Sequence, residues 1–168
     1  DDALALMLAL RSPELDVRAV TIVAGNVGLD QCVVNARRVC QLAAGSAGPA
    51  IHAGAGAPLM RKPVEAAHVH GPDGMGGLSS ELETGRDAEA QAAEEAILSI
   101  AAGAPGEVTL ITLGPMTNAA LAARRDPERF AAIVRYIGVM NIAFGLMLVA
   151  IDAHAGLPWW WTFGEGPP

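Results

Sequence analysis

The stretch DVRAVTIVAGNVGLDQCVVNARRVCQLAAG, from Asp16 to Gly45, predicts a strand, a turn and a helix in immediate succession. Its first ten residues are rich in β-branched side chains and end in glycine. This pattern is typical of a short strand buried in a parallel sheet. The remainder predicts a loop followed by an amphipathic helix that ends at Gly45. The stretch therefore favours an α/β fold.

The same alternation continues on both sides of this stretch. Before it, Asp2 to Leu10 predicts a helix whose first turn is acidic, which complements the helix dipole. After it, strands are predicted at 49–54, 107–114 and 135–140, and helices at 87–103 and 116–134, the last broken near Asp126 and Pro127. Such alternation predicts right-handed βαβ units and an open, mostly parallel sheet with helices on both faces.

Composition limits the class of protein. The chain has 168 residues, of which 52% are hydrophobic and 17% charged. This balance predicts one folded domain with a sizeable core, since domains of this length bury roughly 70% of their unfolded surface. The net charge of −7 repels phosphate backbones and anionic lipids, so neither a nucleic acid nor a membrane is an expected partner.

Cys32 and Cys40 are the only cysteines, and they fall on the apolar face of the helix that ends at Gly45. No Cys-x-x-Cys motif or Cys/His cluster surrounds them, so they are interpreted as core thiols in a reducing compartment and a cytoplasmic location is expected. The longest uncharged stretch, Tyr136 to Ile151, is shorter than the roughly 20 residues of a spanning helix. We interpret it as buried strand and loop.

A long glycine- and proline-rich excursion follows the strand at 49–54, and loops of this length usually serve a site. In open α/β sheets, ligands bind at the carboxyl ends of the strands. Asn26, the loop from Ala53 and the segment from Gly114 to Asn118 are expected at that rim, beside the start of the first helix. The sequence has no Gly-x-Gly-x-x-Gly after a strand and no Gly-x-Ser-x-Gly, which disfavours a dinucleotide site and a serine hydrolase.

Five blocks of sequence carry a resemblance. They are DDALALMLAL (1–10), VTIVAGNVGLDQCVVNA (20–36), IHAGAGAPL (51–59), HVHGPDGMGGL (68–78) and VTLITLGPMTNAALAARRDPE (108–128). In order and spacing they resemble the N-terminal part of the inosine/uridine-preferring nucleoside hydrolases, from Asp1 to about Met140. The resemblance implies an α/β enzyme that cleaves the N-glycosidic bond of purine or pyrimidine ribonucleosides to base and ribose, with one calcium ion in the pocket.

The resemblance also implies roles for individual residues. Asp1 and Asp2 are similar to the last two members of the family's Asp-x-Asp-x-x-x-Asp-Asp cluster, so Asp2 would ligate calcium and Asp1 would bind ribose hydroxyls. Thr117 would offer its backbone carbonyl to the metal. Asn26 would orient the nucleophilic water or the sugar, and His70 would lie near the base as a second catalytic residue.

Each of these residues also has a simpler structural interpretation. Asp1 and Asp2 favour a helix N-terminus, a contribution of about 0.3–1 kcal/mol. Asn26 suits a turn between glycine-rich residues, and Thr117 suits a first helical turn. The remaining histidines, which are His52, His68 and His154, are interpreted as surface or structural side chains.

The resemblance ends at both sides of the matched region. The first two aspartates of the family's cluster have no counterpart in this sequence, and one of them is the family's metal-bound general base. Residues 141–168 match nothing in the family, and Asp152 and His154 lack the context of its distal catalytic pair. We therefore expect a partial hydrolase domain at 1–140 and a divergent segment at 141–168.

Two further expectations concern activity and assembly. The alternative to an active hydrolase is an inactive, family-derived fragment or binding module. The resemblance is also compatible with a homo-oligomer, since family members commonly form dimers or tetramers.

Overall fold

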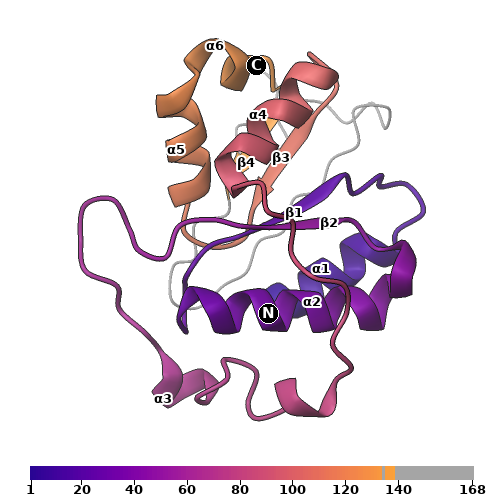
Figure 1. Ribbon diagram of the computed structural model, residues 1–168, viewed down its shortest axis with the longest axis vertical. Helices are drawn as coiled ribbons and strands as arrows, with labels where there is room; N and C mark the ends of the chain where they lie inside the picture. Colours follow the sequence, from indigo (N-terminus) through magenta and orange to yellow (C-terminus); the bar gives the residue numbers. More distant parts are fainter. Residues whose placement is uncertain (134, 139–168) are drawn as a thin grey trace, which may run out of the picture.

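The computed structural model describes residues 1–133 and 135–138 and shows strands alternating with helices (Figure 1). The helices are α1 (Asp2–Arg11), α2 (Leu29–Ala44), α3 (Ala67–His70), α4 (Ala93–Gly103), α5 (Thr117–Arg125) and α6 (Pro127–Ala131), with single 3-10 turns at Gly45–Ala47 and Ser79–Glu81. The strands are β1 (Ala19–Ile22), β2 (Ala50–Ala53), β3 (Thr109–Thr112) and β4 (Arg135–Gly138). The α/β class expected from the sequence is confirmed.

All strand pairing in the described ranges is parallel. β1 pairs with β2, with Ala19 opposite Ala50, and β3 pairs with β4, with Thr109 opposite Arg135. The expected single sheet is therefore present as two parallel pairs, because β1 and β3 share no backbone ladder among the described residues. Helix packing and one side chain, described below, connect the two pairs.

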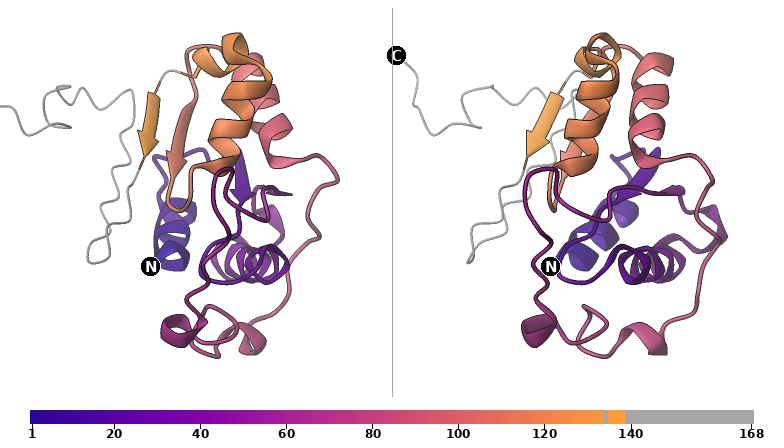
Figure 2. Two further views of the ribbon diagram at one scale, coloured as in Figure 1. Left: turned by 90° about the vertical axis from the view of Figure 1, so that its left-hand side faces the viewer. Right: turned by 60° about the vertical axis from the view of Figure 1, so that its left-hand side comes forward.

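Helices cover both faces of the β1–β2 pair, as expected. In Figures 1 and 2, α1 and α2 lie on one side of this pair and α4 lies on the other. The burial of β2 agrees with this arrangement, since neighbouring strand residues point to opposite faces. Ile51 is 0% exposed and His52 is 5% exposed, so side chains on both faces of β2 are shielded from solvent. His52 is thus a structural histidine, with Nδ1 at 3.0 Å from the Gln91 carbonyl oxygen.

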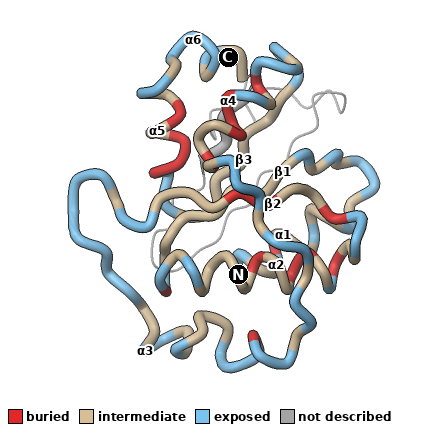
Figure 3. The backbone as a smooth tube through the Cα atoms, in the orientation of Figure 1, coloured by how far each residue is buried: buried red, intermediate tan, exposed pale blue. Residues whose placement is uncertain are grey.

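A second packed region joins α4, α5 and α6 over β3. Ile97, Leu98 and Ala122 form a buried cluster, and Leu110, Phe130 and Ile133 pack against it. Figure 3 shows buried stretches of backbone on both α4 and α5. On α4, Ala93, Ala96 and Ile97 are buried, whereas Ile100 is partly exposed.

The start of α4 differs from the expectation. The sequence pattern placed the helix start at Asp87, but α4 begins at Ala93. The residues before it run along β2: the Glu89 amide donates to the Ile51 carbonyl over 2.8 Å, and Glu89 forms a parallel bridge with His52. An alanine-rich segment with high helix propensity is therefore held extended by an open strand edge.

The break predicted near Asp126 is confirmed. α5 ends at Arg125, and α6 starts at Pro127, which occupies its first turn. The Asp126 side chain accepts a hydrogen bond from the Arg129 amide at 3.0 Å. Asp126 therefore caps α6, because the amides of a first helical turn have no partner within the helix, and Pro127 is tolerated there because it has no amide hydrogen.

In the part of the chain that the structure describes, no helix is long and apolar enough to cross a membrane. Tyr136 lies in β4, in agreement with the strand expected there, while the rest of the uncharged stretch to Ile151 lies outside the described residues. The proposed boundary at residue 140 lies outside them as well, as do Asp152 and His154.

Both cysteines are free thiols on α2, as predicted. Cys40 is buried, and burial raises the pKa of its thiol to about 11. Since the thiolate is the reactive form, Cys40 is expected to resist iodoacetamide at pH 8 in the folded protein and to react in guanidinium chloride. Mass spectrometry of the alkylated peptide measures this difference. Equal labelling rates of Cys40 in the folded and unfolded protein would contradict the packing of α2.

Candidate functional site

Three segments meet where β1 and β2 end. The Ala24 amide donates to the Ala55 carbonyl over 2.9 Å, which extends the pairing of the two strands past their ends. The Asn118 side chain, at the start of α5, contacts both strand ends: its Nδ2 donates to the Ile22 carbonyl and its Oδ1 accepts from the Ala55 amide, each over 2.9 Å. The convergence of the first two strand ends with the 114–118 segment is therefore confirmed. We call this region the rim.

Asp1 and Asp2 begin α1, and Asp1 is the N-cap. The Asp1 carboxylate accepts a hydrogen bond from the Asp2 amide at 3.0 Å, so the capping interpretation of Asp1 is correct. The pKa of Asp2 is raised, chiefly because burial of its carboxyl group disfavours the charged form. The amino group of the first residue and His70 act in the opposite direction. Asp1 therefore caps the helix, and Asp2 stands at its start with His70 among the charges that act on it.

The long loop that carries His70 is attached to the rim. The Asn26 carbonyl accepts a hydrogen bond from the Ala66 amide at 2.9 Å, immediately before α3. The amides of Val69 and His70 then donate to the Ala66 carbonyl, which forms the short turn that carries His70. Asn26 itself is exposed at the end of β1. Its main chain fixes the loop, and its side chain is open to a ligand.

Cys32 and Glu65 also belong to this neighbourhood, although no sequence pattern indicated it. The pKa of Cys32 is raised, mainly by burial, and the negative charges of Asp2 and Glu65 raise it further. Hydrogen bonds to the backbone at Gly25 and Val27 lower it. A second carboxylate, Glu65, thus contributes to the negative potential around Asp2.

Thr117 is the first residue of α5 and is buried beside the rim. The candidate metal ligands, which are the Asp2 carboxylate and the Thr117 carbonyl, are oxygens of the kind that calcium prefers, but calcium takes 6–8 of them. Within residues 1–133 and 135–138, no group of three or more acidic, histidine or cysteine side chains could hold a metal ion. The donors among the described residues are therefore of the kind that calcium prefers, but they are too few to fill its coordination shell.

The loop after α3 is held by its own polar network. Asp73 accepts hydrogen bonds from the amides of Met75, Gly77 and Ser79 at 2.9, 2.9 and 3.0 Å. Asn35 of α2 donates to the Asp73 carbonyl over 2.7 Å and accepts from the buried Ser79 hydroxyl over 2.6 Å. This network attaches the 71–79 turn to α2 and so fixes the far side of the loop that carries His70.

The Asp73 carboxylate should make this turn sensitive to acid. Its amide donors, Gly77 foremost, lower the pKa of Asp73 below its ordinary value of 3.8. A lowered pKa stabilises the folded turn above pH 3.8, and the contribution is lost as the pH falls through the folded-state pKa. We expect the amides of Met75, Gly77 and Ser79 to lose hydrogen-exchange protection in that range.

Asp73→Asn is expected to remove this pH dependence, because the amide side chain does not titrate. Asp16→Asn is the matched control, since Asp16 is exposed and pairs only with Arg18 at 3.6 Å among the described contacts. If the Asp73→Asn turn still loosened in acid at the same pH as the parent, another group would be responsible.

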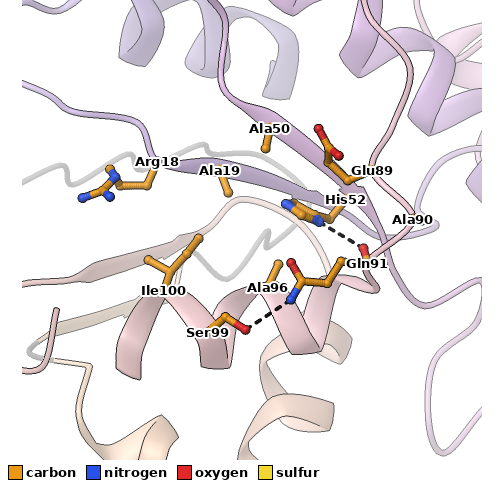
Figure 4. Close-up of a pocket in the computed structure, with 10 residues that line it drawn as sticks. All are labelled: Arg18, Ala19, Ala50, His52, Glu89, Ala90, Gln91, Ala96, Ser99 and Ile100. Atoms are coloured by element: carbon orange, nitrogen blue, oxygen red, sulfur yellow. Dashed lines mark hydrogen bonds between the residues drawn. The ribbon is translucent and has the colours of Figure 1, made fainter. Parts of the chain in front are cut away.

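A hollow of about 430 Å³ lies elsewhere, at the amino-terminal half of β1 and β2. Figure 4 shows it between the strands and α4, lined by Arg18, Glu89, His52 and several alanines. The His52 Nδ1 is already occupied by the Gln91 carbonyl. Because it lies at the wrong end of the strands for an open α/β sheet, we do not assign the function to this hollow.

An open α/β fold with acids, an asparagine and a histidine at the carboxyl ends of its strands defines a ligand-binding domain of the α/β class. The profile of the inosine-uridine preferring nucleoside hydrolases matches residues 1–147. The chain belongs to this family.

Relatives and solved structures agree with this assignment. The chain is 37% identical over 145 residues to the pyrimidine-specific ribonucleoside hydrolase RihB of Escherichia coli O9:H4, covering 86% of this chain and 45% of the relative. It is 38% identical over 163 residues to the uncharacterized protein C1683.06c of Schizosaccharomyces pombe, covering 92% and 52%. The structure of a purine-preferring ribonucleoside hydrolase from Gardnerella vaginalis superposes with a TM-score of 0.75 at 29% identity, covering 82% and 44%. The chain thus spans about half the length of these relatives.

Proposed function

We propose that the protein hydrolyses the N-glycosidic bond of ribonucleosides and releases the free base and ribose. Membership of the nucleoside hydrolase family supports the reaction class. The observation that supports particular residues is the attachment of the long loop to the rim, where the Asn26 carbonyl accepts from the Ala66 amide at 2.9 Å, immediately before the turn that carries His70.

In this reaction, water attacks the anomeric carbon as the bond to the base nitrogen breaks, and positive charge develops on the sugar. The carboxylates of Asp1 and Asp2 face that charge, and Asp1 has one oxygen beyond its cap for a ribose hydroxyl. The Asn26 side chain, exposed at the rim, orients the water or the sugar. His70, on the attached loop, lies on the side where the leaving base takes up its proton.

We also propose calcium as the cofactor, held in part by Asp2 and the Thr117 carbonyl. When bound, calcium would lower the pKa of a water ligand. The oxygen chemistry of both donors supports this proposal, while their number makes added water ligands necessary. A cytoplasmic location is proposed on the basis of the two free thiols.

The test is release of reducing sugar from inosine and uridine by the purified protein, with calcium and with a chelator. Release that needs the protein and falls with the chelator would support the hydrolase and its metal. Equal release with and without the chelator would reject calcium but retain the hydrolase. No release at high protein concentration would reject the proposal and leave the inactive binding module in its place.

A further inference from the structure

Asn118 is buried and uses both ends of its side-chain amide on other segments. It is 5% exposed and is the second residue of α5. Its Nδ2 donates to the Ile22 carbonyl at the end of β1, and its Oδ1 accepts from the Ala55 amide after β2, both at 2.9 Å. A buried amide with both groups paired is expensive to disturb, because a truncated side chain leaves backbone partners unsatisfied.

Gly54 leaves room for the Asn118 side chain because it has no side chain of its own. A Cβ built at Gly54 would lie 2.3 Å from Oδ1, 2.5 Å from Nδ2 and 2.6 Å from the Cγ of Asn118. Separations this short are not sterically possible. Glycine therefore follows β2 because the Asn118 amide occupies the place of a side chain at residue 54.

These contacts connect the two halves of the fold. The pairs β1–β2 and β3–β4 share no backbone ladder in the described ranges, whereas Asn118, which follows β3, bonds to both ends of the first pair. The residue before it is Thr117, whose main chain borders the rim. Asn118 therefore helps to set the position of α5 relative to Asn26 and the loop from Ala53, together with α4, which packs against both β1 and α5.

We infer that Asn118 is a positioning residue of the active site, which sets the start of α5 against the carboxyl ends of β1 and β2 through its close fit with Gly54. The catalytic part of this inference rests on the proposed function. The fit of Asn118 with Gly54 does not, since it is visible in stability alone.

The first experiment is a double-mutant cycle on melting temperature, with Gly54→Ala, Asn118→Ala and both together. Gly54→Ala should lower the melting temperature by several degrees in the parent protein. In the Asn118→Ala background, it should cost little, because the added methyl enters the space left by the amide. Gly56→Ala is the control, since its Cβ would meet nothing closer than the Leu29 side chain at 4.0 Å. Additive losses at Gly54 and Asn118 would overturn the inference.

The second experiment separates positioning from general stability. At a temperature where all proteins are folded, Asn118→Ala should reduce kcat for ribose release at least tenfold. Asn118→Asp retains the acceptor for the Ala55 amide but loses the donor to the Ile22 carbonyl. It should therefore show a similar reduction of kcat. Ile97→Ala is the matched control, because it weakens the buried cluster under α4 and should retain the parent kcat.

The outcomes of the two experiments are distinguishable. Coupling in melting temperature together with a kcat loss confined to the Asn118 variants supports the inference. A kcat for Asn118→Ala equal to that of Ile97→Ala overturns the positioning role. A parent protein without ribose release would overturn the proposed function and the catalytic part of the inference, while the melting cycle would still decide the Gly54–Asn118 fit.

Discussion

Asp2→Asn is expected to lower ribose release by roughly 10²–10³-fold, the loss typical of removing one preorganised electrostatic group. The substitution retains the size of the side chain and removes the negative charge that faces the developing sugar cation. The expected stability change is small, about 0.3–1 kcal/mol, because Asp2 is an acid in a first helical turn. Steady-state kinetics and thermal melting on the same preparation measure the two effects separately.

Glu128→Gln is the matched control for this substitution. Glu128 is also an acid in a first helical turn, in α6, which Figure 1 places at the opposite end of the molecule from the N-terminus. The Glu128→Gln variant should lose about as much stability as Asp2→Asn and should retain the activity of the parent protein. If Asp2→Asn retained full activity, Asp2 would serve only the helix dipole, and the site would have to be sought elsewhere.

Ile51→Ala is expected to destabilise the protein by about 2–5 kcal/mol, the cost of a large-to-small change in a core. Ile51 is 0% exposed and is among the largest fully buried side chains of the described residues. It lies in β2, which packs against α2 and α4, so the cavity would open between the strand and a helix layer. Urea unfolding followed by circular dichroism measures the change.

Val64→Ala is the control for the core substitution. Val64 is 77% exposed on the long loop, so the substitution should change the free energy of unfolding by no more than about 0.5 kcal/mol. If Ile51→Ala lost no more stability than Val64→Ala, β2 would not be buried between helices as the fold describes.

The sequence pattern was sufficient for the order and type of the main elements. The β-branched stretch before Gly25 lies in β1, the helix that ends at Gly45 is α2, and Pro127 divides α5 from α6. These features depend on neighbours in sequence: strand propensity, an amphipathic period and a proline in a first turn. These features therefore do not depend on tertiary contacts.

Features that depend on distant partners could not be predicted in this way. Residues 87–92 are rich in alanine, yet Glu89 is held extended against β2, and nothing local to that segment indicates an available strand edge. The pairing of β1 with β2 apart from β3 likewise depends on tertiary contacts. Propensity is a weak prior wherever such contacts compete with it.

The candidate site shows the same division. The strand ends and the GPMTN segment were expected to meet, and Asn118 brings them together. The part played by Asn118 itself was not foreseen, because a helix N-terminal asparagine has the same sequence signature whether it caps its own helix or bonds to distant strands. Glu65 was missed for a similar reason, since a lone acid in a loop carries no pattern.

Hydrogen exchange in the presence of a non-hydrolysable ribonucleoside analogue and calcium tests the central claim most directly, because it locates the bound ligand without requiring turnover. Protection is expected in the segments 24–27, 66–71 and 114–118, which form the rim and the loop attached to it. The start of β1 and the 89–91 segment beside the hollow should exchange as in the free protein. Protection confined to the hollow, with the rim unchanged, would contradict a nucleoside site at the carboxyl ends of the strands.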